Sequence, residues 1–146
     1  MSLSKQYNTD TSAEKSGVRV TFGHNSDDTE IALILARSGG ANTRFQSVAD
    51  VILKPYRRQI QNDTVDSKVL RAKMVEIYAK TVVKDWENVA LSDVTGNEED
   101  KGYAEFSEEN VIALFTRLPD FFSEVQSITD NLSVFRAEGL EEDAKN

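Results

Sequence analysis

The sequence predicts a mainly α-helical fold, a small helical domain with an N-terminal β-hairpin. Most apolar residues after position 42 recur at helical spacing, and only one short region near the N-terminus alternates as strands do. The two prolines stand where a helix would kink or begin. A chain of 146 residues is long enough to form one domain with its own core.

Composition limits the classes of function. Hydrophobic content of 39% and charged content of 29% indicate a soluble globular protein, and the longest apolar run, IALILA, is too short to span a bilayer. The absence of cysteine excludes disulfides and thiolate metal sites. A net charge of −8 opposes binding to nucleic acid or an anionic membrane. No apolar secretion signal stands at the N-terminus, and we expect no nucleic-acid or membrane partner and a cytoplasmic location.

The N-terminal region is predicted to be a polar arm followed by the hairpin. Residues 1–16 are low in apolar content, so we expect a flexible arm that is ordered only if something holds it, with residues 17–146 as one helical domain. GVRVTF alternates apolar and polar residues, GHNSDD contains turn formers, and TEIALILAR alternates again. A helix from Asp28 onward is the alternative, because Ala and Leu propagate helices well.

The stretch SGGAN breaks the chain before the first long helix. Asn42 is a suitable N-cap, and TRFQSVADVIL then has helical apolar spacing. Pro55 either kinks this helix or starts a second short one, and QNDT is a turn. The expected apolar contacts of these helices are Phe45, Val48, Ala49, Ile52, Tyr56 and Ile60.

The clearest predicted helix runs from about Asp66 to Trp86. Its apolar residues recur at i, i+3 and i+4, and Trp86 closes the stripe as a core anchor at the helix end. After Asn88, VALSDVTGNEEDKGYAE is polar and interrupted by glycines, which predicts a long loop. The other members of the stripe are Leu70, Met74, Ile77, Tyr78, Thr81 and Val82.

Two helices are predicted after this loop. Ser107 is placed to cap the first, with two glutamates in the first turn, where the helix dipole favours acids. That helix covers residues 111–118. Pro119 fits the first turn of the next helix, over residues 120–129, because proline there gives up no needed hydrogen bond.

The end of the chain raises the question of which apolar residues are core. NLSVFRAEGLEEDAKN predicts a last helical piece that buries Leu132 and Phe135 and frays after Gly139.

Phe121 and Phe122 are adjacent, and adjacent helix residues point about 100° apart. Both are buried only where the helix is covered over a wide arc. In so small a domain we expect one of the two to face a partner.

No catalytic or metal motif stands out. His24 is the only histidine and has no second ligand at helical spacing, so we interpret it as a solvated loop residue. Aligning Asp93 with the first EF-hand position puts Glu98 where glycine is needed, which excludes a calcium loop. Gly39 and Gly40 precede a helix without a phosphate-binding motif, so a turn with positive φ explains them. We expect no enzyme, cofactor or metal.

The stretch KPYRRQI is the strongest basic cluster, with Lys54, Arg57 and Arg58 around Tyr56. It is small for a nucleic-acid site, and the overall charge opposes that use. An acidic surface of a partner, or internal pairing with the chain's own acids, explains it at least as well. The candidate partner-binding residues are therefore Phe121, Phe122, Arg57 and Arg58.

Five segments stand in a familiar order: ARSGGANTRF, KPYRRQI, YAKTVVKDWENV, FSEENVIALFTRLPDFFSEVQ and LEEDAKN. Together they resemble the tail assembly chaperones of long-tailed (siphovirus-type) bacteriophages, over residues 17–146. No single motif is diagnostic, because these are packing and surface patterns, and their collinear order gives the resemblance its weight. The chain differs from the family pattern in HNSDDTE and SDVTGNEEDKGYAE.

The resemblance implies a small, mostly helical, non-enzymatic protein of the host cytoplasm. In such families the chaperone coats the long, apolar, helical tape measure protein until tail tube subunits polymerise around it. The implied partner is the tape measure protein, with the major tail tube protein as a second candidate and a homo-oligomer left open. The first alternative is a structural tail or head–tail component retained in the virion. Two others are a small nucleic-acid-associated regulator and an enzyme whose site only folding assembles.

Overall fold

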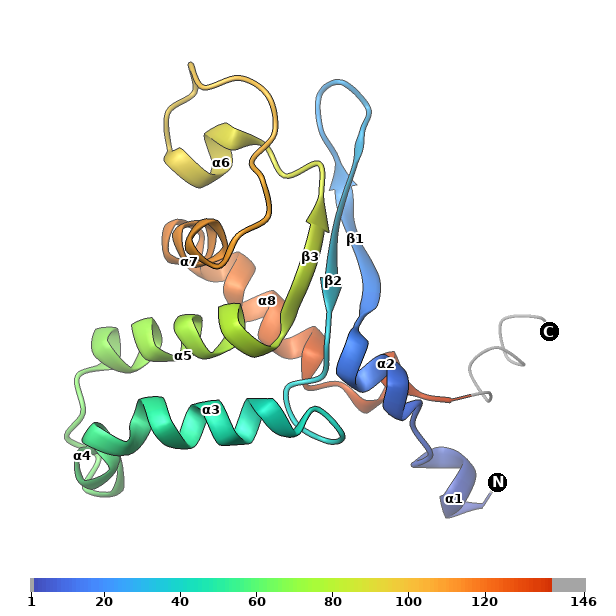
Figure 1. Cartoon of the computed structure of the whole chain (residues 1–146), viewed down its shortest axis with the longest axis vertical. Coiled ribbons are helices and arrows are strands. Elements are labelled where there is room, and N and C mark those ends of the chain that lie inside the picture. The colour runs from blue at the N-terminus through green and yellow to red at the C-terminus, as the bar shows by residue number, and fades with distance from the viewer. Residues whose placement is uncertain (1, 138–146) are drawn as a thin grey trace.

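The computed structural model describes residues 2–137 (Figure 1). A hairpin and a third strand form one sheet, and the longer helices pack beside and behind it. The elements in chain order are α1 (Leu3–Gln6), α2 (Thr11–Ser16), β1 (Val18–His24), β2 (Glu30–Leu35), α3 (Thr43–Leu53), η1 (Lys54–Tyr56), α4 (Arg57–Gln61), α5 (Ser67–Thr81), β3 (Val83–Glu87), α6 (Leu91–Thr95), α7 (Glu108–Arg117), α8 (Pro119–Thr129) and η2 (Leu132–Phe135).

The fold is mixed α/β, so the prediction of a mainly α-helical class is wrong. Helix accounts for 54% of the structure and strand for 16%, and the strands form one antiparallel sheet in the order β1-β2-β3. The predicted hairpin is present, because β1 pairs with β2, with Val20 opposite Leu33. The alternative helix from Asp28 is excluded by this pairing. The sheet gains its third strand from a segment that the sequence assigned to a helix.

The error lies at the end of the predicted helix over 66–86. Helix α5 ends at Thr81, and the chain continues as β3, in which Trp86 pairs with Leu33 of β2. The spacing of Val82 and Trp86 suits a helix. The segment instead pairs with β2, and a register shift in β3 accounts for the burial of both Val83 and Trp86, which are three residues apart. Pairing with the open edge of β2 therefore overrides the local helical pattern, which β-branched residues at 81–83 already weaken.

Several local predictions are confirmed. The Ser107 hydroxyl caps α7 by accepting the Asn110 N–H at 3.1 Å, and Pro119 stands in the first turn of α8. Pro55 stands in η1, which ends α3 and leads into the short α4. Asn42 precedes α3 but makes no side-chain cap, because its amide donates to the carbonyls of Arg37 and Thr81.

The predicted long loop after Asn88 is only partly irregular. It contains α6, and Ala90 and Tyr103 form an isolated bridge that closes the loop on itself. Phe135 is buried as expected, whereas Leu132 is half-buried. The expected fraying after Gly139, and the segment LEEDAKN, lie outside the described residues.

The core lies between the sheet and helices α5, α7 and α8. Tyr78 of α5 meets Phe122 of α8 edge to face at 5.2 Å between ring centroids, and Phe115 of α7 lies 5.0 Å from Phe122. Such aromatic contacts add to the stabilisation that burial supplies. None of the helices within residues 2–137 is long and apolar enough to cross a membrane.

The region predicted as an N-terminal arm contains α1 and α2. Glu14 of α2 is only 1% exposed, and its carboxylate accepts the Ala41 N–H at 2.6 Å and pairs with Arg37 at 3.4 Å. Gly40 makes room for it, because a Cβ there would meet the Glu14 Oε2 at 2.1 Å, and its φ of +54° confirms the predicted turn. Thr9 and Arg136 form a further bridge between the two ends of the described chain.

Candidate functional site

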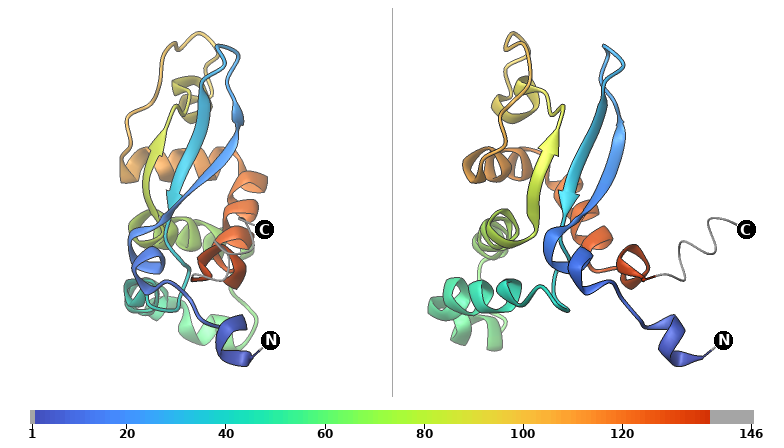
Figure 2. Two further views of the ribbon diagram at one scale, coloured as in Figure 1. Left: turned by 90° about the vertical axis from the view of Figure 1, so that its right-hand side faces the viewer. Right: turned by 45° about the vertical axis from the view of Figure 1, so that its right-hand side comes forward.

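An apolar groove lies between the hairpin and the two C-terminal helices. Its volume is about 470 Å³, and it is bounded by β1 and β2 on one side and by α7 and α8 on the other. Figure 2 shows the hairpin tip and the loop after α6 at one end of the molecule, with α1 at the opposite end. The lining residues are Thr21, Phe22, Gly23, Ile31, Leu33, Val89, Asp93, Leu114, Leu118, Phe121 and Glu124.

The strand wall of the groove is built around a β-bulge. The register shifts between Thr21 and His24, so Phe22 and Gly23 of β1 face the single residue Ile31 of β2. Gly23 has a φ of +89°, which glycine adopts without strain. Bulges redirect side chains. The Phe22 ring here meets the Phe121 ring edge to face at 4.9 Å.

The helix wall of the groove is set by the turn between α7 and α8. Leu114 lies on α7, Leu118 lies at the break between the helices, and Phe121 lies on α8, so the turn brings residues of both helices to the groove. Phe121 is half-buried, whereas its neighbour Phe122 is only 2% exposed and lies in the core. The pair is thus divided between groove and core.

The charged residues of the lining, Asp93 and Glu124, are both acidic. The Asp93 carbonyl accepts a hydrogen bond from the Arg117 Nε at 3.0 Å, and the Glu124 side chain makes no ion pair within residues 2–137. In the same range, no three histidine or carboxylate side chains converge to hold a metal ion. What the groove offers is an apolar surface with an acidic rim.

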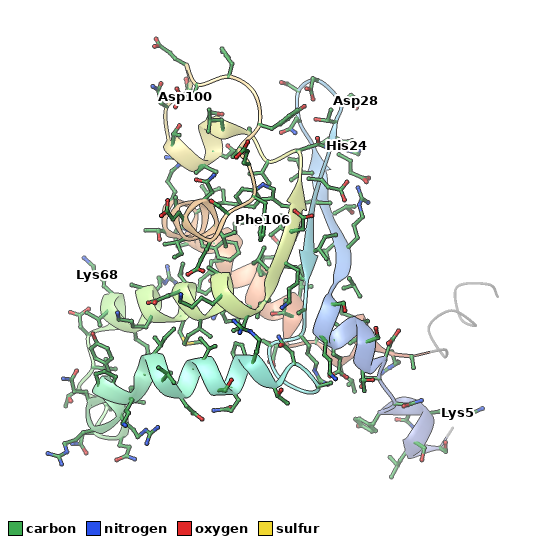
Figure 3. All side chains as sticks on the ribbon, in the orientation of Figure 1. Lys5, His24, Asp28, Lys68, Asp100 and Phe106 are labelled. Atoms are coloured by element: carbon green, nitrogen blue, oxygen red, sulfur yellow. The ribbon has the colours of Figure 1, made fainter. Side chains whose placement is uncertain are left out.

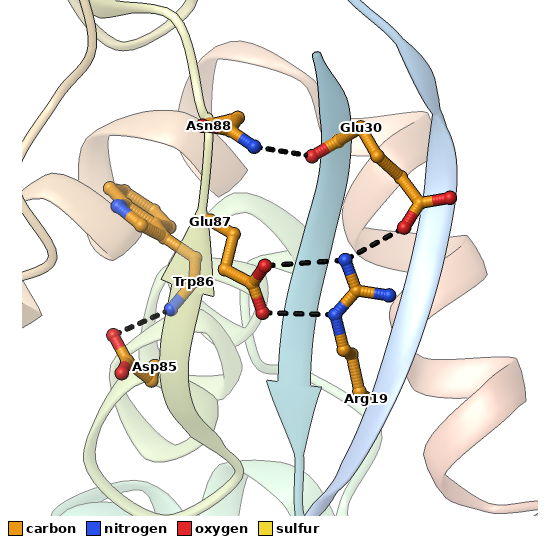
Figure 4. Close-up of polar contacts among 6 residues, drawn as sticks. All are labelled: Arg19, Glu30, Asp85, Trp86, Glu87 and Asn88. Carbon is orange, nitrogen blue, oxygen red and sulfur yellow. Dashed lines mark hydrogen bonds and ion pairs between the residues drawn. The ribbon is translucent and has the colours of Figure 1, made fainter.

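The outer face of the hairpin is fixed to β3 by one arginine (Figure 4). Arg19 pairs with Glu30 at 2.7 Å and with Glu87 at 2.9 Å, which joins all three strands. Hydrogen bonds to Glu87 and then Glu30 raise the pKa of Arg19, and Arg19 lowers the pKa of Glu87 in return. These contacts are exposed, so their contribution to stability is small, but they hold the strand wall in one position.

The tip of the hairpin is held by a second set of polar contacts. The Asn25 amide donates to the Asn88 carbonyl at 2.8 Å, and the Asn88 amide donates to the Glu30 carbonyl at 2.8 Å. Tyr103 donates to the Asp27 carboxylate across the gap between the hairpin and the loop after α6. Hydrogen bonds from Thr29 and then Tyr103 lower the pKa of Asp27. The groove therefore has walls that are positioned before any partner binds.

The other predicted site residues lie elsewhere. Arg57 and Arg58 are exposed on α4 and do not line the groove. Lys54 is exposed in η1, and the Lys73 ammonium lies 5.8 Å from the Tyr56 ring centroid. Figure 3 labels Lys68 at the start of α5, the helix that follows α4 in the chain. It lies far from His24 and Asp28 at the hairpin tip, so the basic cluster and the tip are at different ends of the molecule. The structure brings only Phe121 of the four candidates to the groove.

Sequence reasoning missed most of the groove. Thr21, Phe22 and Gly23 were assigned to a strand and a turn, with no sign that their backbone borders a cavity. Gly23 within a stretch of turn formers was the available signal, because glycine at the end of a strand often marks a bulge. Leu114 and Leu118 lie in the predicted helix over residues 111–118, and the structure buries Leu114 and leaves Leu118 half-buried.

Comparison with known proteins gives one family. A family model described as YdaY prophage protein matches residues 40–146, which is more than half of the chain. The match begins at the glycine turn that receives Glu14 and includes both helices of the groove. Neither the comparison with curated proteins nor that with solved structures gave a match.

Proposed function

The chain belongs to the YdaY prophage protein family and is phage-derived, and from this premise we propose that it is a tail assembly chaperone. In this role it binds the tape measure protein and keeps it soluble until the tail tube polymerises. It acts without catalysis, in the cytoplasm of the infected host. The tape measure protein is its main partner, and the major tail tube protein is a second one.

The observation that supports this proposal most directly is the apolar groove. A chaperone for a long, apolar client needs exposed apolar surface that a stable fold holds open. Phe121 and Phe22 supply such a surface while the larger core beneath them is closed by Phe122 and Phe115. The acidic composition, with a net charge of −8, keeps the chaperone itself soluble while this surface is exposed.

The test is co-expression with the tape measure protein of the same phage genome. The chaperone carries an affinity tag, and both the soluble fraction and the captured fraction of the client are measured. Wild type is expected to raise the soluble fraction several-fold and to retain the client on the resin. Phe121→Asp places a charge in the groove and should abolish both effects.

Val51→Asp is the matched control, because Val51 is 73% exposed on α3 and lies outside the groove. Glu124→Lys is a second groove variant, at an exposed position where the fold tolerates the change. Client capture that survives both groove variants would exclude the groove as the binding site. A client that stays insoluble and unbound with wild type, together with this chain in purified virions, would favour the structural tail component instead.

A further inference from the structure

The outer edge of β1 is open. β1 pairs with β2 alone, and within residues 2–137 no hydrogen bond joins the backbone of Val18–His24 to any other element. Alternate N–H and C=O groups along this strand therefore point away from the sheet. Such an edge is a ready template for another extended chain.

The same edge forms part of the groove wall. Thr21, Phe22 and Gly23 are consecutive, and all three line the groove. Thr21 is exposed and Phe22 is half-buried, so their side chains lie on opposite faces and Thr21 borders the groove near its backbone, while Gly23 has no side chain at all. The bulge at Phe22 and Gly23 adds to this wall, because two residues there face one residue of β2.

These features together specify the chemistry of an occupant. Unpaired backbone groups select a chain in the extended conformation, because main-chain hydrogen bonds supply affinity in strand addition. The groove beside the strand accepts apolar side chains. In an extended segment every second side chain faces the same side, so every second residue should be apolar. The acidic rim of Asp93 and Glu124 favours a basic residue at the end of such a segment.

We propose that the β1 edge and the apolar groove together bind an extended segment of a partner protein, which adds a fourth strand to the sheet beside β1. The segment alternates apolar residues toward Phe22 and Phe121 and carries a basic residue toward Glu124. This inference rests on the proposed function, because the client supplies the segment. It goes beyond it by specifying strand addition rather than a helix lying in the groove.

The probe is a set of overlapping peptides of about 12 residues, longer than a typical strand, that cover the tape measure protein of the same phage genome. A peptide that binds is then made in two forms, with backbone N-methyl groups on its odd or on its even residues. In an added strand one set of N–H groups faces β1 and the other faces away. One form should lose binding at least about tenfold, as expected when several hydrogen bonds are removed, and the other should bind nearly as before.

A matched pair of protein variants tests the other side of the contact. Thr21→Lys places a charge on the open edge and should weaken binding about tenfold, since lysine on an edge opposes strand addition. Thr116→Lys makes the same change on α7 at an exposed position outside the lining and should leave binding unchanged. Equal loss from both methylated forms, or from neither, would overturn strand addition.

The remaining outcomes separate the two proposals. Capture of the full-length client without binding of any peptide would overturn the extended segment and leave the chaperone function standing. Failure to capture the client at all would remove the proposed function and this inference with it. A third outcome is that the chain does not bind the client but forms dimers that Thr21→Lys dissociates. This would show that a second copy supplies the strand that adds to β1.

Discussion

The two edges of the sheet differ in how they end. On the β3 side, the Asp85 carboxylate accepts the Trp86 N–H at 2.8 Å, so a neighbouring side chain satisfies this backbone donor. The Trp86 indole donates to the Ala104 carbonyl at 3.0 Å, and Ala104 itself bonds back to Val89 at 2.8 Å. The loop after α6 thus packs on Trp86 and pairs with the chain directly after β3. Within residues 2–137, no segment pairs with the outer edge of β1.

β1 is instead held at its two ends. Helix α2, anchored by Glu14, leads directly into the strand, and the contacts of Asp27 and Tyr103 hold the hairpin tip that follows it. Bulges and charges limit pairing at sheet edges, and β1 carries a bulge near its tip, but within residues 2–137 no segment covers its outer side. A strand that is fixed at both ends and open between them is suited to binding another chain without rearranging.

The largest effect is expected from removing the residue that joins β3 to the loop after α6. Trp86→Ala takes away a side chain that is 7% exposed, its bond to Ala104, and its edge-to-face contact with Phe106 at 5.7 Å. We expect a loss of about 4 kcal/mol in the free energy of unfolding, measured by denaturant titration. Trp86→Phe retains most of the packing, so its loss in the free energy of unfolding should be clearly smaller. Equal losses in both variants would mean that the indole hydrogen bond carries the effect.

The anchor at the start of β1 should give the next largest effect. Glu14→Ala leaves the Ala41 N–H and the Arg37 guanidinium without their carboxylate, and we expect a loss of about 3 kcal/mol. Lys15→Ala, an exposed neighbour on α2, should change stability by less than about 0.5 kcal/mol. A Glu14→Ala protein as stable as wild type would show that α2 does not hold β1.

The same carboxylate makes this anchor sensitive to acid. Burial alone would raise the pKa of Glu14, but hydrogen bonds from Thr9 and Ala41 and the charge of Arg37 outweigh it and lower the pKa. The stabilisation is therefore present above the ordinary carboxyl pKa and is lost as pH falls through the lowered value. The free energy of unfolding, measured across this acid range, should fall more steeply with falling pH in wild type than in Glu14→Ala.

A smaller effect is expected where Asp85 caps the β3 edge. Asp85→Ala frees the Trp86 N–H, and we expect a loss of about 1 kcal/mol. Glu98→Ala, at an exposed position in the loop after α6, is the control and should be neutral. If Asp85→Ala also makes the chain self-associate in light scattering, the side-chain cap protects this edge from strand addition. A monomeric variant would assign that protection to the loop.

The smallest effect concerns the hairpin tip. Tyr103→Phe removes a donor to Asp27, so the pKa of Asp27 should rise toward its ordinary value, although Thr29 still lowers it. NMR titration of the Asp27 carboxyl carbon in both proteins measures this shift. The same hydrogen bond raises the pKa of Tyr103. An unchanged Asp27 titration would mean that the tip is not held through this contact.

Local signals in the sequence were sufficient for elements that short-range chemistry defines. Ser107 caps α7, Pro119 opens α8, and the alternation after Gly17 forms the hairpin, because each depends on residues a few positions apart. The glycine turn at Gly40 was also predicted from its own residues. The contact of this turn with Glu14 was not predicted, because Glu14 lies 26 residues earlier in the chain.

The tertiary structure decided the rest. Residues 83–87 became a strand because β2 offered an open edge, and no local pattern records the presence of a distant edge. Phe121 and Phe122 are chemically identical, and packing separates them, because Phe121 meets Phe22 of the bulged strand while Phe122 is buried against Tyr78 and Phe115. Local residue chemistry sets where the chain turns and which positions are apolar. Packing decided which of those apolar residues stay exposed, because exposure depends on partners that the chain brings together only when it folds.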